Sequence, residues 1–233
     1  MNIVVFGANG PTGRLLTQQA LDADHRVTAL TRRPADFPLA HPALTVVEGD
    51  VLDAYDVDAV VAGQDVALSA LGVPYGRTPV SVYSEGARNI LSAMARHGVR
   101  RFAGVTSSAT EPNPRPQGGF FFEKVLQPFV IGVLGRTVYA DMRRMEQLVR
   151  ASDLDWTIVR PSGLFNADAV TDYRTGEGHV DGTFTSRADL ADLLLRQATD
   201  DTWVRKTVAI ATLENAPTMM QMLRSEAVPT APR

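Results

Sequence analysis

A glycine-rich segment follows the first apolar run of the chain and has the residue types needed to hold a phosphate. Gly7, Gly10 and Gly13 recur at a G-x-x-G-x-x-G spacing, close to the G-x-G-x-x-G dinucleotide fingerprint. Gly7 allows a tight turn, Gly10 lets the backbone approach a pyrophosphate, and Gly13 lets the next helix lie close to the sheet. The free N–H groups and dipole at the start of that helix favour an anion. The predicted pyrophosphate site comprises Gly7, Asn9, Gly10, Pro11, Thr12 and Gly13.

Two arginines follow the second predicted strand, in the segment Thr31-Arg32-Arg33-Pro34. A site that prefers NAD has Asp or Glu here, to receive the ribose hydroxyls. A guanidinium matches a phosphate in a bidentate fork, whereas a carboxylate repels it. The cofactor is therefore predicted to be NADP(H), with Arg32, nearer the strand end, and Arg33 on the ribose phosphate. A solvated loop with two arginines is the alternative.

Two further strand ends supply candidate cofactor residues. Asp50 and Val51 follow the third predicted strand, where they would flank the adenine ring, with Asp50 accepting from its amino group. Asp50 serves equally well as the cap of the next helix. The end of the fourth strand lies at the crevice where the strand order reverses and ligands bind, although a buried turn explains it as well. Its residues are Ala70, Leu71 and Gly72.

These segments belong to a chain that alternates strand and helix patterns. Short apolar runs predict strands over residues 3–6, 27–30, 44–47, 66–69, 101–106, 156–159 and 207–211. Helical periodicity predicts helices after residue 13 and over residues 55–62, 84–97, 138–151 and 187–198. Strands separated by helices indicate parallel pairing with right-handed crossovers. The predicted fold is α/β, a doubly wound, mostly parallel sheet of the NAD(P)-binding Rossmann type.

The length fits one domain with a small appendage. We expect a single NAD(P)-binding domain over residues 1–226 of the 233, with a small substrate lobe formed by about 162–185 and the C-terminal segment, and a frayed tail at 227–233. A Pro- and Gly-rich loop is predicted at 110–119, beside the end of the fifth strand, and a small hairpin or loop at 166–184.

Composition narrows the classes of partner. The net charge is −3 and there is no cysteine, so nucleic acid and anionic membranes are not expected partners, and disulfides and thiolate metal sites are excluded. The four histidines have no metal-ligand spacing, and no metal site is predicted. The first residues lack a signal-peptide pattern and no apolar stretch is long enough to cross a bilayer. A cytoplasmic location, a small-molecule substrate and a monomer or small homo-oligomer are expected.

With these motifs in place, the chain resembles the atypical short-chain dehydrogenase/reductases, in particular the NAD(P)H-binding group of NmrA-like and flavin reductase (biliverdin reductase B) type. The resemblance runs from Met1 to about Ala211. It is carried by Gly7–Gly13 and by Glu48–Val51, Val105–Ala109, Asp155–Pro161 and Ser186–Ala191. It implies that Thr106 and Pro161 also contact the cofactor, with Pro161 forming a wall beside the nicotinamide.

The chain departs from the wider family at its proton donor. The resemblance implies a Tyr-x-x-x-Lys pair on the helix after the fifth strand, and Tyr139 and Arg143 have that spacing. The apolar stripe of this helix, and the distance to the sixth strand, instead place the family positions on Val138 and Met142. The pair is therefore predicted to be missing, with the Tyr139 ring and Arg143 in a surface contact.

Loss of this pair restricts the chemistry without ending it. Flavins and quinones are electron-poor and accept hydride without a dedicated protein acid, as the flavin-reductase relatives imply, whereas a developing alkoxide needs stabilisation. Ser107 and Ser108, on the crevice rim, are the candidate catalytic residues, as hydrogen-bond donors to substrate or a bound water; turn or cap bonds are the alternative. An NADPH-dependent oxidoreductase is predicted. A non-catalytic NADP sensor and a sugar-nucleotide epimerase or dehydratase are the alternatives.

Overall fold

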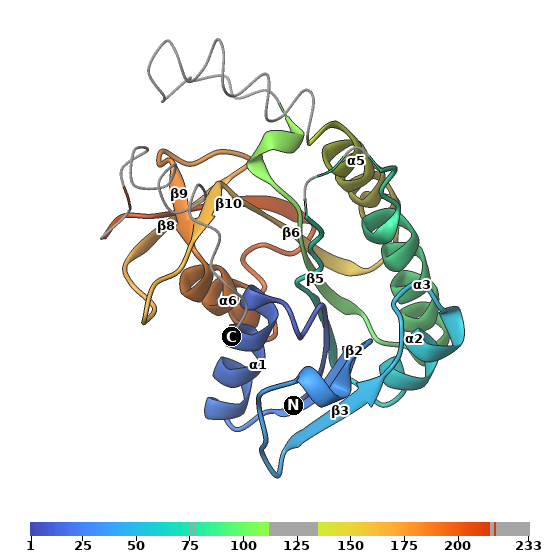
Figure 1. Cartoon of the computed structure of the whole chain (residues 1–233). Helices are drawn as coiled ribbons and strands as arrows, with labels where there is room; N and C mark the ends of the chain where they lie inside the picture. The colour runs from blue at the N-terminus through green and yellow to red at the C-terminus, as the bar shows by residue number, and fades with distance from the viewer. Residues whose placement is uncertain (75, 77, 112–134, 215–216, 218–233) are drawn as a thin grey trace.

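The computed structural model describes residues 1–74, 76, 78–111, 135–214 and 217. Its centre is an eight-stranded sheet in the order β3-β2-β1-β4-β5-β6-β10-β8 (Figure 1), in which every neighbouring pair is parallel except β10 with β8. The strands are β1 (Asn2–Phe6), β2 (Arg26–Thr31), β3 (Leu44–Glu48), β4 (Val66–Ser69), β5 (Arg101–Val105), β6 (Asp155–Pro161), β8 (Tyr173–Glu177) and β10 (Lys206–Thr212). A separate parallel pair joins β7 (Gly163–Phe165) to β9 (Phe184–Ser186).

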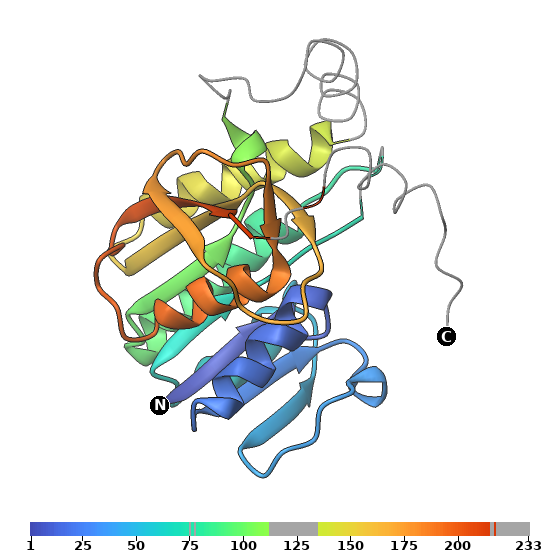
Figure 2. The same ribbon diagram turned by 90° about the vertical axis from the view of Figure 1, so that its left-hand side faces the viewer.

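Helices cover both faces of the sheet. On one face lie α1 (Pro11–Asp22) and α6 (Arg187–Arg196), and on the other α2 (Ala54–Val61), α3 (Val82–His97) and α5 (Arg136–Arg150), as Figures 1 and 2 show. Short 3-10 helices, η1 (Pro34–Asp36) and η2 (Ser108–Thr110), follow β2 and β5. Side chains alternate along β1, so that Val4 contributes to one core cluster and Val5 to the other. The doubly wound Rossmann fold is confirmed.

The bounds of the seven predicted strands and of the four helices predicted after the first agree with the observed ones to within two residues. The first helix, α1, begins earlier than predicted, at Pro11 and not after residue 13, and β7, β8 and β9 were not predicted as strands. Pro11 is the first residue of α1, where its missing N–H costs nothing. Gly98 ends α3 in the left-handed conformation at φ 70°. Within the described ranges, every helix is too short or too polar to span a lipid bilayer.

Of the two alternatives predicted for the region 166–184, a small hairpin or a loop, this region does not form the hairpin. Its one strand, β8, pairs antiparallel with β10, while β7 and β9 pair with each other across it. The segment after β8 passes close to β10. A Cβ on Gly182 would lie only 2.3 Å from the Ala211 Cβ. A long-range partner thus replaces the local one. Most of the predicted loop at 110–119, from residue 112 onward, and the tail at 227–233 lie outside the described residues.

A buried carboxylate on α5 holds the start of α3. The Asp141 carboxylate accepts hydrogen bonds from the backbone N–H groups of Tyr83, at 2.9 Å, and Ser84, at 3.3 Å. It also accepts from the Ser84 hydroxyl at 2.5 Å, whereas Ser81, at the N-cap position, makes no side-chain cap bond. Asp141 is fully buried. The cap that most helices receive from their own chain neighbour comes here from another helix.

Asp141→Ala is expected to lower the free energy of unfolding by about 2–3 kcal/mol, because buried donors lose a charged acceptor. Urea denaturation of the variant and of wild type measures the loss. Gln147→Ala, at an exposed position of the same helix, is the control and should change stability by less than about 0.5 kcal/mol. Equal losses in the two variants would contradict the capping role.

Candidate functional site

The first turn of the predicted phosphate site lies directly against the end of β4. Gly7 has φ +74°, and a Cβ there would come within 2.6 Å of the Ala70 carbonyl oxygen and 2.8 Å of the Leu71 nitrogen. Only glycine tolerates both the dihedral and the approach. The sheet order reverses between β1 and β4, so the glycine turn and the Ala70–Leu71 segment meet where ligands bind in open α/β sheets.

The N-terminus of α1 has the features of an anion-binding site. Gly10 is its N-cap and donates its N–H to the Gly7 carbonyl at 3.0 Å. The helix has no side-chain cap and no acidic residue in its first turn. Because a helix cannot satisfy its own first N–H groups, those of Thr12 and Gly13 have no acceptor within α1, which makes this helix end a candidate anion site. A Cβ on Gly13 would lie 2.1 Å from the Gly7 oxygen, so this glycine lets the helix close on the turn itself.

Three guanidinium groups border the predicted ribose-phosphate position. Arg32 is exposed and makes no side-chain hydrogen bond or ion pair with any residue that the structure describes. Arg33 pairs with the Asp36 carboxylate at 3.8 Å. Arg14, which the sequence analysis missed, donates to the Asn9 side-chain oxygen from Nε at 3.0 Å and from its NH2 nitrogen at 2.7 Å. Its position directly after the last glycine of the motif was the available signal.

The segment Asp50–Val51, predicted to flank the adenine, is part of a turn closed by a local hydrogen bond. The Asp50 carboxylate accepts from the Leu52 N–H at 3.0 Å, whereas Asp53 caps α2 by accepting from the Tyr55 N–H at 2.8 Å. The interpretation of Asp50 as the helix cap is therefore wrong, because the helix begins three residues later than that alternative needs. Asp50 stays a candidate acceptor for the adenine amino group.

Two residues of α3, Gly86 and Asn89, position this wall of the site and were not found from the sequence. A Cβ on Gly86 would lie 3.1 Å from a Val51 methyl and 3.3 Å from a Leu71 methyl. The Asn89 side-chain amide donates to the Val51 carbonyl at 3.0 Å. Val51 and Leu71 are thus brought together over one glycine. A glycine inside a helical pattern was the signal for this packing role.

The side chains of the residues after β5 differ in their hydrogen bonds and in their exposure. Thr106 is buried, and its hydroxyl donates to Glu146 at 2.8 Å. The Ser107 oxygen accepts from the Ala109 N–H at 3.2 Å and caps η2, which is the cap role given above as its alternative. Ser108 is exposed. Of the two serines, Ser108 has the hydroxyl that is more available to a substrate.

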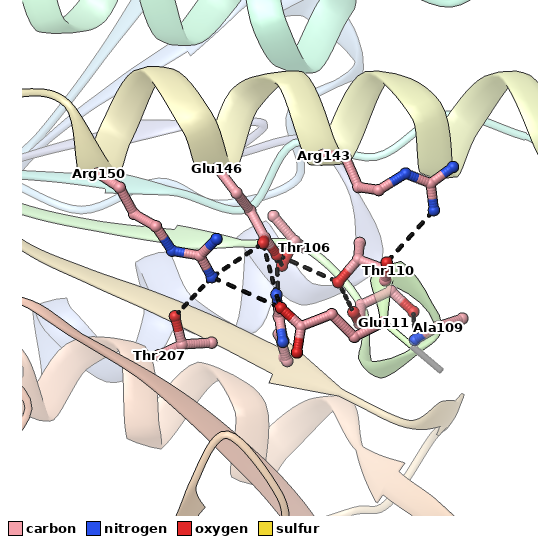
Figure 3. A network of polar contacts seen from close by, with 10 residues as sticks. Thr106, Ala109, Thr110, Glu111, Arg143, Glu146, Arg150 and Thr207 are labelled. Carbon is pink, nitrogen blue, oxygen red and sulfur yellow. Dashed lines mark hydrogen bonds and ion pairs between the residues drawn. The ribbon is translucent and has the colours of Figure 1, made fainter. Parts of the chain in front are cut away.

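An ionic network with a buried centre contacts these residues (Figure 3). Glu146 on α5 is 2% exposed and accepts from Arg160 Nε at 2.9 Å and from the Arg160 NH2 nitrogen at 2.5 Å. Arg150 pairs with Glu146 at 3.2 Å, and Glu111 with Arg160 at 2.7 Å. Burial lowers the pKa of Arg160, but its hydrogen bonds to Glu111 and Glu146 outweigh this and raise that pKa. The hydrogen bond from Arg160 lowers the pKa of Glu111, so both groups stay charged at neutral pH.

The expected proton-donor positions are apolar core positions. Val138 and Met142 are buried within the cluster between α5 and the sheet. The predicted surface contact between Tyr139 and Arg143 is wrong: Tyr139 is 5% exposed, while Arg143 is exposed and donates to the Thr110 carbonyl at 3.3 Å (Figure 3). Because α5 packs against α3, β6 and η2, its buried face is wider than one apolar stripe.

Comparison with protein families decides the class of cofactor. The model of the NAD(P)H-binding family matches residues 7–201. The chain belongs to this family. The expected resemblance to atypical short-chain dehydrogenase/reductases is thereby confirmed, and a nicotinamide cofactor with it. In the part of the chain that the structure describes, no cluster of three acidic or histidine side chains that could hold a metal is found.

The curated relatives differ in the activities named for them. An uncharacterized chloroplastic protein of Arabidopsis thaliana is 29% identical over 70% of this chain and 59% of its own length. A 3-beta-hydroxysteroid dehydrogenase of Mycolicibacterium neoaurum is 31% identical, over 46% of this chain and 32% of its own length. An uncharacterized sugar epimerase of Bacillus subtilis is 27% identical over 84% and 86%. The chain thus spans less than two thirds of the first two relatives.

Solved structures share the fold. A short-chain dehydrogenase/reductase from Veillonella parvula in complex with NADP has a TM-score of 0.74 at 20% identity, over 91% of this chain and 95% of that one. ChuY, an anaerobilin reductase from Escherichia coli O157:H7, has a TM-score of 0.74 at 21% identity, over 94% and 100%. At these identities the likeness establishes the Rossmann fold, and the reaction has to be argued from the site.

Proposed function

We propose that this protein is an NADPH-dependent oxidoreductase that transfers hydride to a small conjugated acceptor, such as a flavin or a quinone. The observation that carries the proposal is the pairing of an uncapped α1 start with arginines, and no carboxylate, directly after β2. The first feature fits a pyrophosphate and the second a ribose phosphate. An NADP complex and a reductase among the structures of the same fold support it.

Each part of the cofactor has a group of candidate residues. The α1 turn would hold the pyrophosphate, Arg32 and Arg33 the ribose phosphate, and Asp50 with Val51 the adenine. The nicotinamide half would lie against Ala70, Leu71, Gly72, Thr106 and Pro161. When bound, the reduced nicotinamide supplies the hydride. The residues of this chain orient it and exclude water from one side.

The buried apolar pair Val138 and Met142 decides which acceptors are suitable. Reduction of a carbonyl to an alcohol develops charge on oxygen, and a phenol beside an ammonium group would stabilise it. Apolar side chains at the two family positions cannot do so. A conjugated acceptor spreads the charge over its own rings, so an exposed hydroxyl such as that of Ser108, or water, suffices to deliver a proton.

Steady-state oxidation of NADPH with FMN, a quinone or dichlorophenolindophenol is expected to be detectable for the purified protein. Ser108→Ala should lower kcat by no more than about tenfold, because water replaces a weak hydrogen-bond donor. The control is Ser152→Ala, whose hydroxyl donates to the Val149 carbonyl at the far end of α5.

The same apolar pair favours a second candidate function, a non-catalytic NADP sensor that regulates a partner. NADPH binding without turnover across the acceptor panel would support the sensor and contradict the reductase. Turnover of a nucleotide sugar would contradict both functions and support the epimerase alternative; a sugar epimerase is named among the relatives of this chain.

A further inference from the structure

Arg14 links the two segments between which a ribose phosphate would lie. It is the fourth residue of α1, and its side chain runs back toward the start of the helix. Two of its nitrogens reach the Asn9 side-chain oxygen, at 2.7 and 3.0 Å, and one also reaches the Asp36 backbone carbonyl at 3.4 Å. Asn9 belongs to the glycine turn and Asp36 to η1, directly after β2. The Arg14 guanidinium therefore bridges the glycine turn and η1, the short helix that follows Arg32 and Arg33.

The positive charge of Arg14 is not neutralised by any carboxylate that the structure describes. Its partners there are an amide oxygen and a carbonyl oxygen, and it forms no ion pair with a described carboxylate. Arg33, by contrast, pairs with the Asp36 carboxylate. A guanidinium has five N–H donors, and the described contacts of Arg14 use its Nε and NH2 nitrogens, which leaves the NH1 edge for an incoming anion.

We propose that Arg14 binds the ribose 2′-phosphate together with Arg32, and that Arg33 contributes less. Contacts from two segments already hold the Arg14 guanidinium in place, so little side-chain entropy is lost when a phosphate binds. Arg32 has no described competitor for its charge, whereas Asp36 competes for Arg33. This inference rests on the proposed NADPH function and deepens it, by adding a third residue and ranking the three.

Calorimetric titration with 2′,5′-ADP and with 5′-AMP tests the assignment, because the two nucleotides differ only in the 2′-phosphate and neither needs catalysis. Arg14→Ala and Arg32→Ala are each expected to weaken 2′,5′-ADP by about 10- to 100-fold and to leave 5′-AMP within about threefold, as for one charge-assisted contact. Arg33→Ala should cost less than Arg14→Ala. Arg26→Ala, at the opposite end of β2, is the matched control and should bind like wild type.

The outcomes separate this inference from the proposed function. If wild type prefers 2′,5′-ADP but Arg14→Ala keeps that preference, or loses both nucleotides equally, the Arg14 assignment is overturned while NADPH recognition stands. If wild type binds the two nucleotides alike, the proposed NADPH preference and the Arg14 assignment are both overturned. Arg14→Gln keeps a hydrogen bond to Asn9 without the charge, and it provides the same comparison if the alanine variant is poorly folded.

Discussion

The double variant Arg32→Ala, Arg33→Ala is expected to bind NADPH about 100-fold more weakly than wild type, while NADH binding changes by less than about threefold. Each lost charge-assisted hydrogen bond to a phosphate is worth about 1.5–3 kcal/mol, and about 1.4 kcal/mol is a factor of ten in Kd. NADH lacks the 2′-phosphate and so has nothing to lose there. Fluorescence titration of both cofactors at one fixed, low ionic strength measures the two ratios.

A matched control removes two positive charges elsewhere on the surface. Arg88 and Arg96 are exposed on α3 and pair with Glu85 and Asp58. Their double alanine variant changes net charge by the same amount and should leave the preference for NADPH intact. Equal weakening of NADPH and NADH in the Arg32, Arg33 variant would contradict the assigned phosphate site, and so would no weakening of either.

Glu146→Ala is expected to lower the free energy of unfolding by about 3–5 kcal/mol, because it leaves the buried Arg160 guanidinium without its main counter-charge. It also removes the acceptor of the Thr106 hydroxyl. The loss bears on the candidate site, since α5, the residue after β5 and the carboxyl end of β6 are joined through this one carboxylate. Urea denaturation of wild type and variant, fitted with a slope common to the two proteins, measures the change.

Glu111→Ala is the control that makes the comparison decisive. Glu111 bonds the same guanidinium, but its side chain is 59% exposed, and exposed ion pairs contribute about 0–1 kcal/mol. Similar losses for the two glutamates would show that burial does not set the strength of this network. Glu146→Gln, which keeps the shape of the side chain, should fall between wild type and the alanine variant.

The features predicted correctly from the sequence are those that short-range physics sets. The Gly7 turn and the end of α3 before Gly98 each depend on the backbone of a few adjacent residues. Apolar runs and helical periodicity located the strands and helices for the same reason. The position of the two arginines directly after β2 follows from those bounds, and their role at the ribose phosphate stays a prediction.

Other contacts, in the fold and beside the candidate site, required the folded chain. Asp141 meets Tyr83 across 58 residues, and Thr106 meets Glu146 across 40. No spacing rule selects such pairs, because many carboxylates in the sequence are equally eligible. The pairing of β8 with β10 was not predicted, and the predicted surface position of Tyr139 was wrong, for a related reason: both depend on which neighbours pack against an element.

The sequence by itself determined the order of the predicted strands and helices, the glycine turn after β1 and the residue types around it, since these depend on local dihedral preferences and periodicity. Only the tertiary structure decided that Arg14 reaches the loop after β2, that Asp36 engages Arg33, and that Val51 and Leu71 meet over Gly86. These contacts join segments whose approach depends on packing of the whole sheet, and residue spacing along the chain carries no information about it.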